Sequence, residues 1–359
     1  MKMPNILTPV KTLDGAVQVI EAGADELYCA VTVPNAVHVL NRPEECCVQS
    51  YGELSKITAY ARAHGIPTIA TLELPFVAEF MAEQMEEHVY SLVDAGVEAL
   101  IVGDVGQIQM VRRMGLDVPL HASTFLGAMN PEAVAWLRDM GVVRVVLERH
   151  VTLPEISEMV ARADGVEIEV FAFGGGCSNI NSNCYLTGKL VLYAEEADAA
   201  KVQEEMKGVW KPCRFPYEVY DYHTGRYLAR APIMDGYAFC PLCDLPELVL
   251  SGVDGLKIVD RCRPLAHQLA ATHMLRALTD LIVGDGLPFD EAKRARFGEL
   301  LEEYKDVVIE LTHPAPGSRM PPTPLRLREL ACKDKRCYFV PLLHRPYALQ
   351  GTPERVERP

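Results

Sequence analysis

Short apolar segments alternate with amphipathic segments along most of the chain. The apolar segments are rich in β-branched and aromatic residues, as strands are, and the amphipathic segments repeat apolar residues at helical spacing. The apolar segments predict strands at residues 6–10, 26–31, 68–74, 99–104, 119–124, 143–148, 167–173 and 255–259. The amphipathic segments predict helices at residues 13–22, 51–64, 78–95, 105–114, 130–140, 153–163, 264–281 and 290–304.

This succession of strand and helix predicts a parallel sheet, because parallel strands need a crossover connection between them. Glycines that follow predicted helices, at Gly23, Gly96 and Gly141, supply the left-handed conformation that ends a helix. Eight units favour a closed barrel over an open doubly wound sheet. The predicted fold class is therefore α/β, a TIM-like (β/α)8 barrel.

Two departures from a regular barrel define the predicted domain organisation. Residues 174–250, after the seventh strand, form a connection much longer than an ordinary barrel loop. The connection leaves from the carboxyl ends of the strands, where barrel enzymes hold their active sites. We assign residues 1–284 to the barrel, including this insertion, and residues 285–359 to a C-terminal helix and extended tail, with a proline-rich stretch at 314–324.

The insertion begins with three consecutive glycines and carries a set of cysteines. Cys177 and Cys184 follow the glycines in a loop rich in Asn and Ser, and Cys213 and Cys240 come later. Glycine allows the backbone to approach a bulky group closely. Four thiolates suit an iron–sulfur cluster or a tetrahedral zinc ion. We therefore expect a metal centre over the barrel mouth, with buried thiols that bind no metal as the alternative.

The other cysteines are interpreted from their surroundings. The N-terminus lacks a signal-peptide pattern and no apolar run reaches about 18 residues, so we expect a cytoplasmic protein with reduced thiols. Cys243 is an alternative to Cys240 as a ligand. Cys332 and Cys337 are expected to be structural or incidental, with a second metal site as the alternative. Cys29 and Cys262 are interpreted as packing residues of barrel strands. Cys46 and Cys47 are expected to be core or solvent-exposed thiols, with a ligand of the metal centre as the alternative.

The charge balance bears on the partner. The formal net charge is −14 and the pI is about 5.2. A surface that binds nucleic acid needs basic groups to neutralise phosphates. We therefore do not expect nucleic acid as a partner and expect a small-molecule substrate instead, with a local basic groove on the acidic protein as the alternative.

Four polar residues in or near the ends of predicted strands are candidate catalytic residues: Asp104, His121, Arg149 and Glu169. A histidine and carboxylates around one barrel mouth can transfer protons. Arg149 and Arg261 can bind a carboxylate of the substrate through paired N–H groups. The alternative for each residue is membership of a salt-bridge layer that closes the barrel.

Several segments resemble the collagenase-like U-type peptidase family, many of whose members are regarded as oxygen-independent hydroxylases with an iron–sulfur cluster. The resemblance covers most of residues 5–265. Its motifs are AGADELY at 22–28, VGDVG at 102–106, LHAST at 120–124, VVLER at 145–149, EVF at 169–171 and GVDGLKI at 252–258.

The resemblance implies a four-iron cluster on Cys177, Cys184, Cys213 and Cys240, with zinc as the alternative. It further implies oxygen-independent hydroxylation of a small or lipid-like aromatic substrate, with prephenate as a candidate oxygen donor. The rival functions are hydroxylation of an RNA base, a non-catalytic cluster-bearing partner subunit, and a peptidase or peptide-binding barrel. The resemblance also implies the protein partners of this chain. They are a related family member in a heterodimer, further copies of this chain, or an electron-transfer protein.

Overall fold

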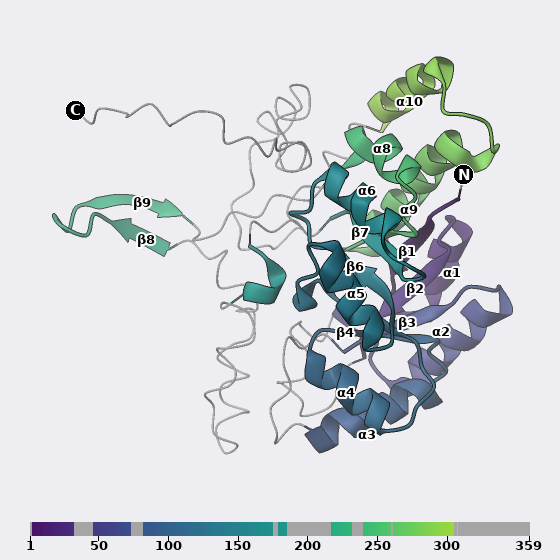
Figure 1. Cartoon of the computed structure of the whole chain (residues 1–359), viewed down its shortest axis with the longest axis vertical. Coiled ribbons are helices and arrows are strands. Elements are labelled where there is room, and N and C mark those ends of the chain that lie inside the picture. Colours follow the sequence, from purple (N-terminus) through teal and green to yellow (C-terminus); the bar gives the residue numbers. More distant parts are fainter. Residues whose placement is uncertain are drawn as a thin grey trace.

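The computed structural model describes residues 2–31, 46–72, 82–174, 179–184, 217–231, 240–259, 261–304 and 307. Eight strands in this part of the chain are β1 (Asn5–Pro9), β2 (Glu26–Cys29), β3 (Thr68–Thr71), β4 (Ala99–Val102), β5 (Leu120–Ala122), β6 (Val142–Val146), β7 (Glu167–Phe173) and β10 (Gly255–Ile258). They close into a parallel barrel in the order β1-β10-β7-β6-β5-β4-β3-β2 (Figure 1). The predicted TIM-like barrel is confirmed.

Helices surround the barrel and follow its strands in the chain (Figure 1). They are α1 (Leu13–Glu21), α2 (Tyr51–Ala63), α3 (Ala82–Asp94), α4 (Val105–Arg113), α5 (Pro131–Asp139), α6 (Leu153–Ala161) and α9 (Leu265–Thr279). Polar side chains begin several of them: Thr12 and Asn130 each accept a hydrogen bond from a backbone N–H three residues later. The predicted terminal glycines are confirmed, because Gly23, Gly96 and Gly141 have φ of 101°, 90° and 85°.

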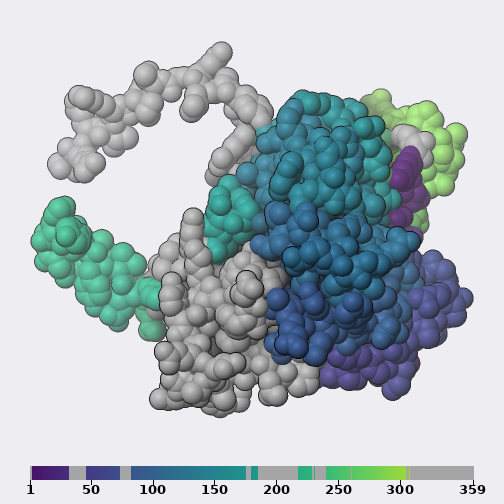
Figure 2. Space-filling view, turned by 60° about the horizontal axis from the view of Figure 1, so that its bottom comes forward, coloured from purple at the N-terminus to yellow at the C-terminus, as the bar shows by residue number. Residues whose placement is uncertain are grey.

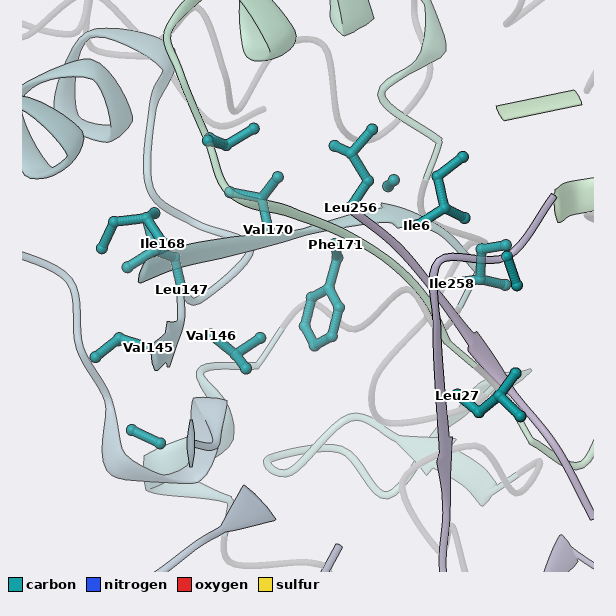
Figure 3. Packing of buried hydrophobic residues seen from close by; sticks show 14 of the residues in the cluster. Ile6, Leu27, Val145, Val146, Leu147, Ile168, Val170, Phe171, Leu256 and Ile258 are labelled. Atoms are coloured by element: carbon teal, nitrogen blue, oxygen red, sulfur yellow. The ribbon is translucent and has the colours of Figure 1, made fainter. Parts of the chain in front are cut away.

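The main hydrophobic core lies between the strands and the helices. Outward-facing strand residues such as Leu27, Ile168 and Leu256 are fully buried in it (Figure 3). A second, smaller cluster consists of Leu7, Tyr28, Ile69, Ala99 and Ile101, from β1 to β4. Because neighbouring residues of a strand face opposite sides, Tyr28 points into the barrel while Leu27 points out. One part of the barrel interior is therefore apolar.

The long insertion contributes described elements that the sequence did not predict. A short 3-10 turn, η4 (Asn181–Asn183), follows β7, and an antiparallel hairpin of β8 (Tyr217–Tyr220) and β9 (Tyr227–Ala231) comes later. A 3-10 turn, η8 (Leu242–Asp244), then leads into α8 (Leu245–Leu250), which packs beside α6 and α9. The chain thus returns to the barrel before β10.

The C-terminal extension begins as predicted with a helix. A π-helical turn at Asp280–Gly284 follows α9, and α10 (Glu291–Glu303) then packs on both, with Phe297 buried in the main core. The predicted proline-rich stretch at 314–324 and the tail lie outside the described residues. No helix in the described part of the chain is both long and apolar enough to cross a membrane.

One expectation about the cysteines is wrong. Cys46 and Cys262 form a disulfide that joins segments 216 residues apart in the sequence. Closure of the barrel explains the pairing, because β1 lies between β2 and β10 and the segments that follow those two strands meet. Cys29 and Cys47 are buried thiols, as expected.

Gly174, where the chain leaves β7, makes a close backbone contact. Its φ is 82°, and a Cβ atom added there would lie 2.6 Å from the carbonyl oxygen of Val259. Backbone packing between the ends of β7 and β10 therefore requires this glycine. The expectation that the glycines make room for a metal centre is not needed to explain Gly174, and residues 175 and 176 lie outside the described part.

Replacing Gly174 with alanine should destabilise the protein more than replacing Gly65, which has φ of 72° but no atom within 4 Å of the added Cβ. Gly65→Ala should cost about 1–2 kcal/mol for the left-handed conformation. Gly174→Ala should cost about 1–3 kcal/mol more, because the Val259 carbonyl must move. Urea unfolding of both variants measures the difference, and equal costs would contradict the assigned packing role.

Candidate active site

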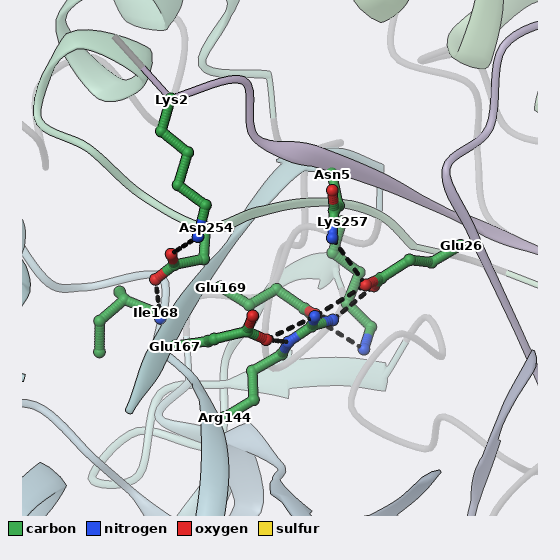
Figure 4. A network of polar contacts seen from close by, with 9 residues as sticks. All are labelled: Lys2, Asn5, Glu26, Arg144, Glu167, Ile168, Glu169, Asp254 and Lys257. Carbon is green, nitrogen blue, oxygen red and sulfur yellow. Dashed lines mark hydrogen bonds and ion pairs between the residues drawn. The ribbon is translucent and has the colours of Figure 1, made fainter. Parts of the chain in front are cut away.

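A buried ionic network lies in the barrel interior and joins residues of β2, β6, β7 and β10 (Figure 4). Arg144 of β6 lies at its centre and pairs with Glu26 of β2, with an Nη2–Oε1 distance of 2.7 Å. It also pairs with Glu169 of β7, at 3.2 Å between Nη1 and Oε2, and Lys257 of β10 lies 3.0 Å from the other Glu169 oxygen. Asn5 donates to Glu26 at 2.8 Å. The buried charges thus compensate one another.

The network accounts for the burial of Glu169, a predicted catalytic residue. Its side chain is fully buried. Burial alone would raise the pKa of Glu169, but the positive charges of Lys257 and Arg144 hold that pKa below its usual value. The placement matches the alternative of a salt-bridge layer, and the catalytic role stays a prediction. Gly255 makes room, since a Cβ there would lie 3.0 Å from the Cγ of Glu169.

The sequence reasoning missed the other members of the network. Arg144 and Lys257 each interrupt an otherwise apolar strand, and Glu26 begins one. A charged residue at an inward position of a barrel strand requires a partner of opposite charge. Inspection of these positions for complementary charge would have found the network.

His121 lies on β5 beside the same network. Its imidazole is buried, and burial lowers its pKa to about 3, with the charges of Arg144 and Lys257 acting in the same direction. Nδ1 of His121 makes no hydrogen bond within the described residues. The imidazole is therefore neutral near pH 7, and its unprotonated nitrogen can accept a hydrogen bond.

A second polar cluster lies at the carboxyl ends of β5, β6 and β7, and it fixes the turn that precedes Cys184. Asn181 of η4 donates from its side chain to Thr124 at 2.6 Å, and its backbone N–H donates to the buried Glu148. Arg149 donates to the Asn181 side-chain oxygen at 3.2 Å. These four residues, Thr124, Glu148, Arg149 and Asn181, are called the rim cluster below.

Arg149 also contacts the barrel interior. Its guanidinium carbon lies 4.4 Å from the centre of the Phe171 ring, and its backbone N–H donates to Glu148 at 3.1 Å. The predicted substrate-binding residue Arg149 is therefore positioned at the mouth by an aromatic ring and a carboxylate. Its binding role stays a prediction. The sequence reasoning missed Asn181 and Glu148, although both lie within segments that it singled out.

The remaining predicted side chains lie elsewhere. Asp104 begins α4 and accepts hydrogen bonds from the backbone N–H groups of Gly106 and Gln107, so it caps a helix. Arg261 is buried after β10. Burial raises the pKa of the Cys29 thiol, and the positive charge of Arg261 opposes that rise. The catalytic and binding roles of Asp104 and Arg261 stay predictions.

Two predicted metal ligands fall within the described residues. Cys184 directly follows η4, and Cys240 precedes η8; both are half-buried, as is Cys243 within η8. Cys177 and Cys213 lie outside the described residues, as do Cys332 and Cys337. No group of three or more metal-binding side chains is present in the described part alone.

Comparison with known proteins identifies the relatives of this chain. The model of peptidase family U32 matches residues 11–306. The "tRNA hydroxylation protein P1" of Bacillus subtilis is 24% identical over 290 residues, which cover 79% of this chain and 65% of that protein. The "tRNA hydroxylation protein P2" of the same organism is 26% identical over 311 residues, covering 86% and 95%.

A third relative is an rRNA enzyme. The "23S rRNA 5-hydroxycytidine C2501 synthase" of Escherichia coli is 25% identical over 283 residues, which cover 77% of this chain and 39% of that protein. The chain thus spans 65% or less of the length of several curated relatives that it matches.

These relatives correct two expectations. A small or lipid-like aromatic substrate is wrong as the main expectation, because the relatives are named for hydroxylation of tRNA or rRNA. The expectation that nucleic acid is not a partner is wrong for the same reason. It relied on the net charge of −14, which sums the whole chain and does not describe any one surface.

Replacing Arg144 with methionine should lower the free energy of unfolding by about 3–5 kcal/mol, because buried carboxylates lose their partner. Arg162→Met is the matched control. Arg162 pairs with Glu132 and Glu158 at the surface, so its loss should cost about 1 kcal/mol or less. Denaturant unfolding compares the two variants, and similar costs would contradict the importance of the network.

The stability should depend on pH through His121. Its pKa is about 3 in the folded protein against 6.5 ordinarily, so between these values the unfolded chain binds the extra proton. Stability should therefore fall as the pH drops below 6.5, by about 1.4 kcal/mol per pH unit for this group. His121→Leu should remove that part of the slope, and the exposed His64→Gln should not. Unfolding measured between pH 7.5 and 4.5 tests this, and an unchanged slope in His121→Leu would count against it.

Proposed function

This chain belongs to peptidase family U32, and from that membership we propose that it is an enzyme that hydroxylates a base of RNA without dioxygen. One observation carries the proposal: relatives aligned over most of this chain are named for hydroxylation of tRNA or 23S rRNA. The closed barrel, with polar groups at the carboxyl ends of its strands, supports an active site at that end.

The proposed cofactor is a four-iron cluster bound by Cys177, Cys184, Cys213 and Cys240. Thiolates are the usual ligands of such clusters, so the donor set is chemically suitable. Cys184 and Cys240, the two within the described residues, both belong to the insertion that follows β7. When bound, the cluster would supply electron-transfer chemistry next to the substrate base.

The rim cluster would hold the cofactor loop and orient the base. Hydrogen bonds from Asn181 to Thr124 and Glu148 fix the turn directly before Cys184. Arg149, held over Phe171, is a planar group that can stack on a base or donate hydrogen bonds to its edge. Binding of the base at this position would place it between the barrel interior and the cysteine-bearing loop.

The substrate class is tested by deleting the gene in the source organism and analysing nucleosides from tRNA and rRNA by mass spectrometry. We expect loss of a nucleoside that carries one additional oxygen, and recovery with the wild-type gene. Asn181→Ala should restore less of the modified nucleoside than Ser182→Ala, its neighbour in η4. Unchanged nucleosides in the deletion strain would refute the proposed substrate class.

The ligand set is tested by iron and sulfide analysis after anaerobic purification. Cys184→Ala and Cys240→Ala should each lose most of the bound iron, whereas Cys243→Ala should retain it. The neighbouring pair Cys240 and Cys243 thus provides a matched comparison. Iron loss in Cys243→Ala but not in Cys240→Ala would assign the ligand to Cys243, and iron-free wild-type protein would refute the cluster.

A further inference from the structure

The β8–β9 hairpin extends away from the barrel (Figures 1 and 2). Its aromatic side chains are exposed to an unusual degree: Tyr220 and Tyr227 are each 53% exposed, and Tyr222 at the tip is 94% exposed. Every residue of β8 is exposed, so neither face of that strand packs on the described barrel. A two-stranded hairpin gains little stability from its own burial. Its exposed tyrosines therefore call for a functional explanation.

One face of the hairpin combines aromatic and basic groups. Tyr220 and Tyr227 are cross-strand partners, with ring centres 5.7 Å apart and planes nearly perpendicular. On the same face, Glu218 of β8 is the cross-strand neighbour of Arg230 of β9 in the sheet register. Perpendicular rings leave aromatic surface accessible to a planar ligand.

The acidic groups of the hairpin are used internally, and the basic groups are not. Asp221 accepts hydrogen bonds from the backbone N–H groups of His223 and Thr224, and Glu218 accepts one from the Tyr220 hydroxyl. Arg226 and Arg230 are exposed, and neither forms an ion pair within the described residues. The hairpin is thus locally neutral within an acidic chain, and both of its guanidinium groups are open to solvent.

The tip of the hairpin is held in one conformation. The Asp221 side chain fixes the turn, its backbone N–H donates to the Arg226 carbonyl, and its carbonyl accepts from the Gly225 N–H. The rings of Tyr222 and His223 pack edge to face at the tip, with centres 5.3 Å apart. A prearranged turn loses less conformational entropy when its side chains bind a ligand.

We propose that the hairpin binds an unpaired segment of the substrate RNA. Its bases would stack on Tyr220, Tyr222 and Tyr227, and its phosphates would contact Arg226 and Arg230. Stacking of bases on aromatic side chains beside basic groups is the usual basis of single-strand binding, and it suits an overall acidic protein because stacking needs no net charge. The inference rests on the proposed function, since it assigns a contact of the same RNA substrate away from the mouth.

The test is direct binding by the full chain. Fluorescent probes are an unmodified tRNA transcript, a single-stranded RNA of about 12 nucleotides, and that strand annealed to its complement. Tyr220→Ala/Tyr227→Ala should weaken binding of tRNA and of the single strand at least about tenfold. The matched control is Tyr90→Ala/Trp136→Ala, which removes aromatic side chains that are 46% and 54% exposed on outer helices. It should change the Kd less than about twofold.

The contribution of the two arginines is tested separately, by the salt dependence of RNA binding. Arg226→Gln/Arg230→Gln should reduce the dependence of log Kd on log salt by about 1.4, the loss of two contacts to a single strand. Circular dichroism and the Tm should be unchanged in all variants, because the altered side chains are exposed. An unaltered salt dependence would show that the two arginines do not contact the RNA phosphates.

The outcomes separate this inference from the proposed function. If the wild-type chain binds RNA and the Tyr220→Ala/Tyr227→Ala variant binds it equally well, the hairpin inference is refuted and the proposed function stands. If the wild-type chain binds no RNA probe and the deletion strain keeps its modified nucleosides, both are refuted. If the hairpin variant changes the oligomeric state in size-exclusion chromatography with light scattering but not the RNA affinity, the surface is a protein interface and the inference is refuted.

Discussion

The barrel depends on the buried pairing of Arg144 with the carboxylates of Glu26 and Glu169. β6 and β2 lie on opposite sides of the closed sheet, so the pairing with Glu26 crosses the interior. A buried charge without a partner is far less stable than one in water, so each of these residues requires the others. The apolar cluster of β1 to β4 adjoins the network, since the Lys257 ammonium lies 4.6 Å from the centre of the Tyr28 ring. Complementary charge and hydrophobic packing therefore both fill the barrel interior.

The same strands that hold this network carry the candidate active site. Phe171 lies two residues beyond Glu169 on β7, and Arg149 follows the end of β6, which carries Arg144. Once the network fixes the register of β6 and β7, Arg149 comes to lie over Phe171 and within reach of Asn181. Stability of the barrel interior and geometry of the mouth are thus physically linked. His121 shares this environment, which keeps its imidazole neutral.

Charge has different meanings at different length scales in this protein. The net charge of −14 governs long-range repulsion of polyanions, but over distances beyond about 10 Å salt screens it. Local recognition depends on which groups are exposed together. In the hairpin two carboxylates balance two arginines, and several tyrosines are exposed beside them. A local surface can therefore suit RNA on a chain whose composition alone argues against it.

The sequence by itself determined the order and number of the barrel elements, since hydrophobic periodicity and glycine at helix ends are local properties; β7 was predicted at its observed bounds. It also marked the segments that contain the rim cluster. Only the tertiary structure decided which side chains meet: that Glu169 faces Arg144 and Lys257, that Asp104 caps a helix, and that Cys46 bonds to Cys262. These contacts join residues distant in the chain, and closure of the sheet brings them together. Strand patterns specify an inward face but not its partners, so the chemistry of the interior followed from the closed barrel.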